Sequence, residues 1–399
     1  MPGAVSRRLR SSPPTIRARV SGLAMATIGI LGGGQLARML ALAGAPLGHR
    51  FLVVDNAEDP CAAQVAPLLH ADWRDRDALV EFARRIDVAT FDFENVPAET
   101  AHWLTGHVAV FPNPEALATA QDRFLEKTLF TGAGIGTPAF ATVDSLDDLR
   151  DACARIGLPA VLKTRRLGYD GKGQCVLREP ADIERAWQRL GGVPLILEAF
   201  VPFDCEVSVI AVRSRSGEFR HYPLTRNWHR DGILSASLAP LEGFVELEQR
   251  AIAHARELAE RLDYVGVFAL ELFVHGGQLL ANEMAPRVHN SGHWTIEGTA
   301  CSQFENHVRA VLGQPLGDTA ARGHSVMLNW IGELPEAGPV LAEPGAHWHD
   351  YGKSPRAGRK VGHATLCADD PATLAAMLER VGRALGRAEQ VAPVIAALG

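Results

Sequence analysis

The residues best placed for chemistry are two glutamates, Glu271 and Glu283, each set inside an apolar run of FALELFVHGGQLLANEMAPR at residues 268–287. The two runs flank a pair of glycines and predict a β-hairpin. If the turn contains three residues, 276–278, the two glutamates lie directly opposite each other on one face. A two-residue turn would place them on opposite faces of the hairpin.

Facing carboxylates repel each other unless a cation lies between them. Hard oxygen ligands held beside phosphate groups are what Mg²⁺ uses in proteins, and Asn282 could add a neutral oxygen. We therefore predict that Glu271 and Glu283 are metal ligands. The alternative is two unrelated glutamates facing solvent, which the apolar flanking residues disfavour.

A glycine-rich loop follows the apolar strand and cations of LPAVLKTRR at 158–166. A loop whose backbone N–H groups surround phosphate needs glycine wherever a Cβ would collide with the ligand. Lys163, at the strand end, can reach phosphate oxygens as a point charge. The spacing of a Walker loop is absent, so we predict a lid over a triphosphate; the alternative is an exposed β-turn with solvated lysines. This lid comprises Gly168, Tyr169, Asp170, Gly171, Lys172, Gly173 and Gln174.

A second glycine loop, GILGGGQLA at 29–37, lies between a predicted strand and helix. Gly32, Gly34 and Ala37 match the dinucleotide fingerprint G-x-G-x-x-A, and Asp55 ends the next strand. Any phosphate-bearing ligand can use a helix N-terminus in the same way. The motif therefore leaves three interpretations open: NAD or FAD binding, another phosphate ligand, or a structural turn.

Two further segments are too rich in hydrogen-bond donors for simple connectors. The segment APRVHNSGHW at 285–294 predicts an anion site rather than zinc, because further cysteine or histidine ligands at suitable spacing are lacking. The basic loop YGKSPRAGRKVGH at 351–363 predicts a phosphate clamp, with a solvated surface as the alternative. Their candidate residues are Arg287, His289, Asn290, Ser291 and His293 in the first and Lys353, Arg356, Arg359 and Lys360 in the second.

The overall composition favours a soluble enzyme of two or three domains with small-molecule partners. The 399 residues carry a net charge of −6 without a broad basic excess, so a nucleic-acid partner is not expected. No apolar run approaches the roughly 18 residues of a membrane span. Six scattered cysteines without a CxxC pair indicate reduced thiols in the cytoplasm. Residues 1–24 resemble a transit peptide in composition, but we interpret them as a disordered tail or a mis-assigned start.

The pattern of apolar runs predicts α/β and α+β domains along the chain. Short strands alternate with helices from residue 25 to about 125, the signature of a parallel sheet. One long helix is predicted across PEALATAQDRFLEKTLFTGAG at 114–134. We assign 126–320 to a second domain, with a smaller subdomain at 137–201 that carries the lid, and 321–399 to a separate β-rich module with one helix from Pro371.

These features together resemble the ATP-grasp ligases. More specifically, GGGQLARM, FDFENVP, GYDGKGQ, YPLTRNWHRDGIL, NEMAPRVHNSGHWT and GRKVGH are similar, in order and spacing, to the 5-(carboxyamino)imidazole ribonucleotide synthases of purine biosynthesis. The likeness covers almost the whole chain after about Thr27. It departs from the family at Ala37, where glycine is common, and at FDF, where YEF is more usual. The resemblance implies an ATP-grasp domain between a Rossmann-like N-terminal domain and a small C-terminal β-rich domain.

The resemblance also implies a reaction in which ATP, bicarbonate and aminoimidazole ribonucleotide give the N-carboxylated ribonucleotide, ADP and phosphate. It implies a homodimer and, around the nucleotide, the following residues: Arg123, Lys163, the lid, Glu198, Ala199, Phe200, Val201, Glu206 for the ribose hydroxyls, His229, Asn282, and the metal ligands Glu271 and Glu283. Lys172 and Arg287 would add positive charge, and Asp170 is the candidate general base, with a turn-capping role as the alternative.

The ribonucleotide would then lie between the basic loop and the N-terminal glycine loop, with its phosphate held by Lys353, Arg356 and Arg359. Candidate contacts from the other segments are Gly33, Gly34, Gln35, Asn290, Ser291, His293 and Lys360. Three alternatives stay open: another ATP-grasp ligase of the purine pathway, an NAD-dependent oxidoreductase that uses the first glycine loop, and a nucleotide sensor without catalysis.

Overall fold

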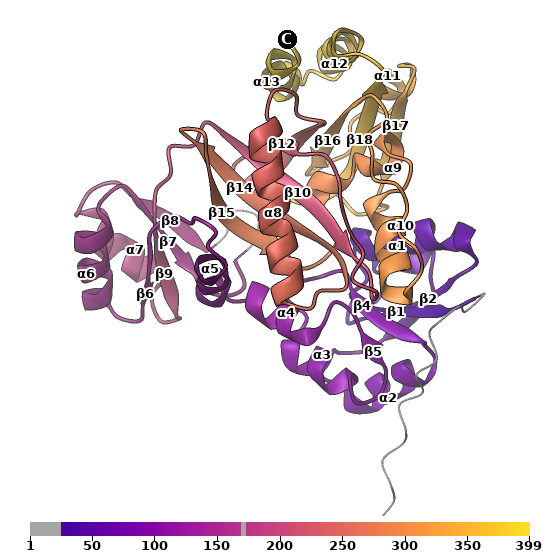
Figure 1. The fold of residues 1–399 in the computed structure, drawn as a ribbon, viewed down its shortest axis with the longest axis horizontal. Helices are drawn as coiled ribbons and strands as arrows, with labels where there is room; N and C mark the ends of the chain where they lie inside the picture. The colour runs from indigo at the N-terminus through magenta and orange to yellow at the C-terminus, as the bar shows by residue number, and fades with distance from the viewer. Residues whose placement is uncertain (1–24, 169–172) are drawn as a thin grey trace, which may run out of the picture.

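The computed structural model describes residues 25–168 and 173–399, which form three sheets with helices packed on them (Figure 1). One sheet has five strands and belongs to the N-terminal residues, one has four strands, and the third has nine strands. Among the described residues, no helix combines the length and apolarity needed to cross a membrane.

The N-terminal sheet is entirely parallel, as the alternating pattern predicted, with the order β3-β2-β1-β4-β5. Its central strands are mostly apolar and buried because helices and other elements cover both faces. Helix α1 follows the glycine loop and packs against α10 of the nine-stranded part through a shared buried cluster. The elements are β1 (Thr27–Leu31), α1 (Gln35–Gly44), β2 (Arg50–Asp55), β3 (Leu68–His70), α2 (Arg76–Arg84), β4 (Val88–Phe91), α3 (Ala98–Leu104) and β5 (Ala109–Val110).

The predicted long helix at 114–134 is two helices, α4 (Pro114–Ala120) and α5 (Arg123–Gly132). The break occurs at Gln121 and Asp122. The Asp122 carboxylate caps α5 by accepting from the Phe124 N–H and also binds Arg165 and Arg166 at the start of the glycine-rich lid. Side-chain capping competes with helix continuation, and this break sets Arg123 at the beginning of α5.

The four-stranded antiparallel sheet projects from the body of the molecule, at the left of Figure 1. Its order is β6-β9-β7-β8, and helices α6 and α7 share its buried apolar cluster. The strand β7 ends at Thr164, shortly before the lid. The elements are β6 (Phe140–Val143), α6 (Leu146–Ile156), β7 (Ala160–Thr164), β8 (Gln174–Leu177), α7 (Asp182–Leu190) and β9 (Leu195–Ala199).

The nine-stranded antiparallel sheet is the centre of the molecule. Its main order is β15-β14-β10-β12-β13-β16-β18-β17, and β11 pairs with β10. Helix α8 lies across the β10 and β15 region (Figure 1). The elements up to residue 312 are β10 (Cys205–Arg213), β11 (Phe219–His221), β12 (Thr225–Arg230), β13 (Ile233–Ala239), α8 (Val245–Arg261), β14 (Gly266–His275), β15 (Gln278–Ala285), α9 (Thr295–Gly298) and α10 (Gln303–Leu312).

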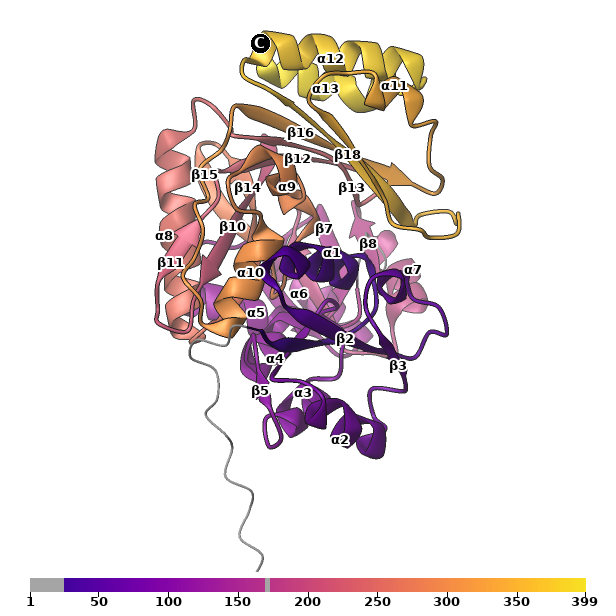
Figure 2. The ribbon, with the colours of Figure 1, turned by 90° about the vertical axis from the view of Figure 1, so that its right-hand side faces the viewer.

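The C-terminal residues add strands to this central sheet instead of forming a sheet of their own. Strand β16 (His324–Ile331) pairs with β13, and β18 (Lys360–Ala368) and β17 (Ala346–Asp350) extend the sheet beyond it. Two helices, α12 (Pro371–Ala384) and α13 (Ala388–Leu398), cover these strands, with the short α11 (Gly338–Leu341) beside them (Figure 2). The sequence predicted only the first of the two long helices.

The hairpin of β14 and β15 turns over two residues, so the predicted three-residue turn is wrong. His275 pairs with Gln278, and the two glycines between them have φ values of 54° and 72°. Positive φ at both central positions is what a tight hairpin turn requires, and glycine adopts it without steric cost.

A β-bulge nevertheless brings the two glutamates opposite each other. Leu272 pairs with Ala281, whereas Glu271 pairs with Glu283, so Asn282 is one extra residue on β15. The extra residue shifts the register by one position and returns Glu283 to the face of Glu271. The predicted pairing is therefore confirmed, although the turn alone would have prevented it.

Helix α5 holds the bulge from one side. The fully buried Lys127 donates to the backbone carbonyls of Ala281 and Asn282, at 3.0 and 2.9 Å. Its neighbour Glu126 accepts from the backbone N–H of Met284 at 2.6 Å. Because buried backbone groups that leave the strand ladder need partners, these contacts stabilise the irregular register.

Candidate active site

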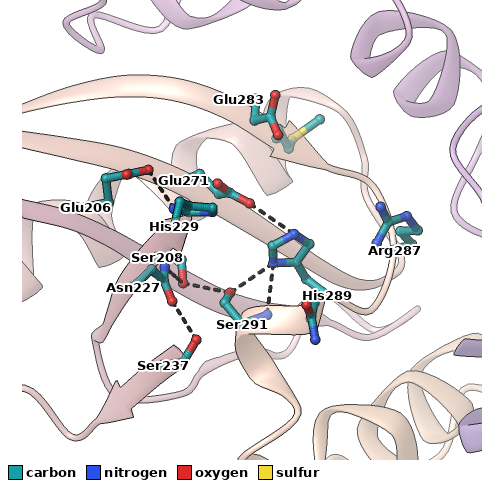
Figure 3. Close-up of polar contacts among 12 residues, drawn as sticks. Glu206, Ser208, Asn227, His229, Ser237, Glu271, Glu283, Arg287, His289 and Ser291 are labelled. Atoms are coloured by element: carbon teal, nitrogen blue, oxygen red, sulfur yellow. Dashed lines mark hydrogen bonds and ion pairs between the residues drawn. The ribbon is translucent and has the colours of Figure 1, made fainter. Parts of the chain in front are cut away.

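The facing carboxylates each have a cationic or hydrogen-bonding partner from another segment, and Figure 3 shows the contact of Glu271 with His289. Glu283 lies 3.0 Å from Arg123, the first residue of α5. Glu271 lies 2.9 Å from the Nε2 atom of His289, in the segment after β15. The carboxylate of Glu271 is nearly buried, and these partners offset the cost of that burial.

A second acid and a histidine border the same face of the sheet. Glu206 on β10 lies 3.1 Å from His229 on β12. Burial by itself would lower the pKa of His229, but the hydrogen bond and charge of Glu206, together with the charges of Glu271 and Glu283, raise it. The charges of Glu271 and Glu283 therefore favour the protonated form of His229. For Glu271, burial would raise the pKa, but His289, His229 and Lys360 lower it to about 2.

A chain of buried side chains continues along this face, because Ser208 lies directly opposite Glu271 and Asn227 directly opposite Glu206 (Figure 3). Ser237 donates to the Oδ1 atom of Asn227 at 2.8 Å, and the Nδ2 atom of Asn227 donates to Ser208 at 2.9 Å. Because the Ser208 oxygen accepts that bond, its own proton is available to the hydroxyl of Ser291, 2.8 Å away. The orientation of the Asn227 amide thus sets the direction of the chain.

The chain ends at His289 and determines which of its nitrogens carries the proton. The Nδ1 atom lies 2.9 Å from the Ser291 hydroxyl and also accepts from the Ser291 backbone N–H at 3.3 Å. Nδ1 is therefore the acceptor, and Nε2 carries the proton that points to Glu271. The sequence placed His289 in the anion segment but predicted no individual role for it.

A second charge cluster lies where the four-stranded sheet meets α5. The carboxylate of Glu198, on β9, lies 3.0 Å from Lys163 on β7 and 3.4 Å from Lys127. Burial would raise the pKa of Glu198, but Lys163, Lys127 and Arg123 lower it to about 2. Lys163, predicted to meet phosphate, thus lies beside a carboxylate at the mouth of the lid. The predicted residues Ala199, Phe200 and Val201 follow directly along β9 and its end.

Arg287 forms an ion pair with Glu94, which lies just after β4 of the N-terminal sheet. Its guanidinium also donates to the carbonyl of Val288 at 3.0 Å. Burial would lower the pKa of Arg287, but Glu94, Asp92 and Glu283 raise it. The cation predicted in the anion segment therefore joins the N-terminal domain to the segment that follows β15.

The N-terminal glycine loop is arranged differently from a dinucleotide site. The buried Asp92 lies at the N-terminus of α1 and accepts from the Ala37 N–H at 3.3 Å, where a pyrophosphate would bind in a dinucleotide fold. Asp55, the expected ribose ligand, instead accepts from the Gly33 and Ala57 N–H groups at 2.6 and 2.8 Å. Burial raises the pKa of Asp92 to about 7. This arrangement argues against the NAD interpretation.

The basic loop and the N-terminal glycine loop come together, as predicted for a common cleft. Lys353 donates to the side chain of Gln35, and the side chain of Gln64 donates to the carbonyl of Gly352 at 3.4 Å. The Arg356 side chain is exposed. Arg359 donates to the carbonyl and hydroxyl of Ser354, at 3.1 and 2.9 Å, within its own loop.

Some of the residues predicted to contact a ligand are buried instead of exposed. His293 is fully buried and lies 3.3 Å from the side chain of Gln303. Asn290 is buried and exchanges amide hydrogen bonds with Asn329. Ser291 is buried in the chain that reaches His289. These positions suit support of the site better than direct contact with a ligand. Tyr169, Asp170, Gly171 and Lys172 lie outside the described residues.

Sequence reasoning missed four site residues. Glu94 and Asp92 lie at the carboxyl end of a parallel strand, the edge where ligands bind in open α/β sheets. That position could have identified them as candidate site residues from the sequence. Glu126 and Lys127 gave no such signal, because a charged pair inside a helix usually faces solvent. Burial and the nearby charge of Glu283 raise the pKa of Glu126 to about 8.

Models of three domain families match the chain. They are the ribonucleotide synthetase preATP-grasp domain at residues 25–121, the ATP-grasp domain at 128–304 and the phosphoribosylaminoimidazole carboxylase C-terminal domain at 325–377. The N5-carboxyaminoimidazole ribonucleotide synthase of Pseudomonas aeruginosa is 55% identical over 358 residues, which cover 89% of this chain and 98% of that protein. The chain belongs to the N5-carboxyaminoimidazole ribonucleotide synthase family.

Solved structures of this family agree with the fold. The synthetase from Thermus thermophilus has a TM-score of 0.86 at 54% identity, over 89% of this chain and 98% of that one. The synthase from Aspergillus clavatus, in complex with ADP and 5-aminoimidazole ribonucleotide, has a TM-score of 0.83 at 30% identity, over 90% and 99%. The predicted ATP-grasp fold with a Rossmann-like N-terminal domain is confirmed.

The depressed pKa of Glu198 predicts a pH dependence of stability. Its folded pKa of about 2 lies below the ordinary value of 4.5, so its stabilising contribution is complete above that value and is lost as the pH falls towards 2. Glu198→Gln should therefore flatten the decline in unfolding free energy between about pH 5 and pH 3.5, by up to ~1.4 kcal/mol per pH unit. Urea unfolding at a series of pH values measures this slope.

The same substitution at Glu115, an exposed side chain at the start of α4, is the matched control and should keep the wild-type slope. Equal slopes for Glu198→Gln and the wild type would contradict the assignment of Glu198 as an ionised, buried carboxylate.

Proposed function

We propose that this chain catalyses the ATP-dependent carboxylation of 5-aminoimidazole ribonucleotide by bicarbonate, giving N5-carboxyaminoimidazole ribonucleotide, ADP and phosphate in purine biosynthesis. Membership of the synthase family supports the substrates. The observation that carries the chemistry is the bulge that sets Glu271 opposite Glu283, beside Arg123 of α5 and the Nε2–H donor of His289.

The nucleotide end of the reaction is assigned to the junction of the four-stranded sheet, α5 and the central sheet. Lys163 and Arg123 would bind phosphate oxygens, exchanging their present carboxylate partners Glu198 and Glu283 for the ligand. The backbone from Ala199 to Val201 would hold adenine, and Glu206 the ribose hydroxyls. The lid residues from Gly168 to Gln174 would cover the phosphates.

The carboxylate pair fits Mg²⁺. Both ligands are hard oxygens on adjacent strands in register, and the described residues contain no group of three or more His, Cys, Asp or Glu able to hold a metal by themselves. That donor set suits an ion that completes its coordination with phosphate oxygens and water. When bound, Mg²⁺ would neutralise charge on the transferring phosphoryl group.

Bicarbonate is a poor electrophile and must first accept the γ-phosphoryl group of ATP, which forms carboxyphosphate and releases ADP. That step requires alignment and positive charge rather than a protein nucleophile. Arg287, Lys163 and Lys172 supply this charge in the proposal. The amine of the ribonucleotide then forms the new C–N bond and phosphate leaves, either directly or after release of carbon dioxide. Asp170 would accept the amine proton.

The ribonucleotide is assigned to the cleft between the N-terminal glycine loop and the basic loop. The contact between Gln35 and Lys353 joins the two loops across 318 residues of sequence. Lys353, Arg356 and Arg359 would hold the phosphate as charge-assisted donors. Asn290, Ser291 and His293 would support this cleft from behind, and Lys360 would contribute from the base of the loop.

Three further properties belong to the same proposal: Mg²⁺ as the divalent ion, a homodimer, and a cytoplasmic location. All six cysteines are free, which suits a reducing compartment. The dimer rests on family resemblance alone, and light scattering coupled to size-exclusion chromatography would measure it.

The reaction is tested by ADP release in the presence of Mg²⁺. We expect turnover with bicarbonate and aminoimidazole ribonucleotide, and none above background with formate and glycinamide ribonucleotide. Turnover with only the second pair would assign the chain to another purine ligase. ATP binding without hydrolysis under either condition would indicate a sensor, and tight NAD binding without ATP binding would revive the oxidoreductase interpretation.

Glu283→Gln should abolish turnover at ordinary Mg²⁺ concentrations while leaving the fold intact. The substitution deletes the charge of a ligand without removing core volume. Steady-state ADP release measures the first effect, and the thermal midpoint should stay within a few degrees of the wild type. A wild-type rate at ordinary Mg²⁺ would refute the ligand role of Glu283.

Arg356→Ala should raise the KM for the ribonucleotide about tenfold and leave the KM for ATP within about twofold, because it removes one charge-assisted contact to the ribonucleotide phosphate. Initial rates with each substrate varied in turn give both constants. The reverse ordering of the two effects would move the clamp to ATP.

A further inference from the structure

The motif GRKVGH at 358–363 contains one titratable side chain that the proposed function does not use. Arg359 and Lys360 are assigned to the ribonucleotide, but His363 is fully buried and cannot reach a ligand in the cleft. It lies on β18, just beyond the base of the basic loop. Its contacts show what such a buried imidazole can do there.

His363 and His349 close the base of the basic loop. They are directly opposite each other on β18 and β17, and their rings stack with centroids 4.2 Å apart and an interplanar angle of 8°. Gly362 permits this approach, since a Cβ there would lie 2.5 Å from the carbonyl oxygen of His349. The β17–β18 hairpin is shown in Figure 2, below the C-terminal helices.

Tyr351, the first residue of the loop, is bound to the same imidazole. Its hydroxyl lies 2.7 Å from the Nδ1 atom of His363, and both side chains are almost fully buried. Burial lowers the pKa of His363 well below its usual range and raises that of Tyr351. The tyrosine hydroxyl therefore donates and the histidine Nδ1 accepts. Two residues later, Lys353 lies with its Nζ atom 5.8 Å from the Tyr351 ring centre and donates to Gln35.

The histidine pair also contacts the segment that follows β15, which carries Glu283. His349 lies 2.8 Å from the carboxylate of Glu297 on α9. The ring of His293, from the anion segment, lies 5.0 Å from that of His363. The hairpin base is thus joined to the same stretch of chain that supplies Arg287 and His289.

We propose that Tyr351, His363, His349 and Glu297 form an anchor that positions Lys353 against the N-terminal glycine loop and ties the ribonucleotide site to the anion segment. Tyr351 and His363 are positioning residues, because they act through Lys353 and touch no substrate. The proposal rests on the proposed function, which assigns Lys353 to the ribonucleotide phosphate.

The test compares single variants in steady-state kinetics and in equilibrium binding of aminoimidazole ribonucleotide by calorimetry. Tyr351→Phe removes the hydroxyl and keeps the ring. We expect it to raise the KM and Kd for the ribonucleotide about tenfold, with kcat and the KM for ATP within about twofold. His363→Asn retains an acceptor near Nδ1 and should lose less than His363→Leu, which retains none.

A double variant separates positioning from general damage. If Tyr351 acts through Lys353, adding Tyr351→Phe to Lys353→Ala should weaken ribonucleotide binding by less than about twofold more. His347→Asn is the matched control, because His347 lies on β17 with His349 but has an exposed side chain. It should behave as the wild type. Additive losses of ribonucleotide affinity in the double variant would overturn the anchor. So would equal rises in the KM for the ribonucleotide and the KM for ATP.

Failure of the anchor and failure of the proposed function give different results. If Lys353→Ala weakens ribonucleotide binding while Tyr351→Phe and His363→Leu do not, only the anchor is refuted. If Lys353→Ala leaves ribonucleotide binding unchanged, the phosphate clamp is refuted, and the anchor proposal fails with it.

Discussion

The site depends on holding two carboxylates face to face, an arrangement that electrostatics opposes. A single extra residue on β15 makes it possible, because the bulge at Asn282 reverses the face on which Glu283 lies. Repulsion between the glutamates is then relieved by Arg123 on one side and His289 on the other. Both partners come from segments outside the hairpin, so the hairpin alone cannot form the site.

The same principle of pairing recurs across the cleft. Glu198 is held by Lys163 and Lys127, and Glu94 by Arg287. Most of these pairs join different parts of the chain, and a buried charge that lost its partner would be costly. In the proposed function, an anionic nucleotide and a cation would exchange partners with these groups without leaving any of them unpaired.

Much of the fold followed from the sequence because the signals were local. The parallel N-terminal sheet, the helix α7 and the strand β7 follow from hydrophobic periodicity and turn residues. The errors arose where a side chain overrode the local pattern. Asp122 breaks a helix by capping it, and the bulge at Asn282 depends on Lys127, which is distant in sequence.

The site residues also divide into those with a local sequence signal and those that depend on residues distant in sequence. Glu271, Glu283, Lys163 and Lys353 were predicted as site residues because a charge within an apolar run or a glycine-rich loop is unusual. Which residues pair with one another across the domains could not be predicted from local patterns. Glu94 meets Arg287 across 193 residues, and Gln35 meets Lys353 across 318. Such pairs become visible only once the domains are assembled.

The strand β16 joins β13 to the C-terminal residues, and this order of assembly affects the growing chain. During synthesis, the ATP-grasp residues emerge before residue 324. Until β16 is made, the edge of β13 that pairs with β16 has unpaired backbone donors and acceptors. An open edge of this kind is a template for pairing with other chains. A polypeptide that stopped short of β16 would therefore be prone to aggregate, whatever the integrity of its nucleotide-binding half.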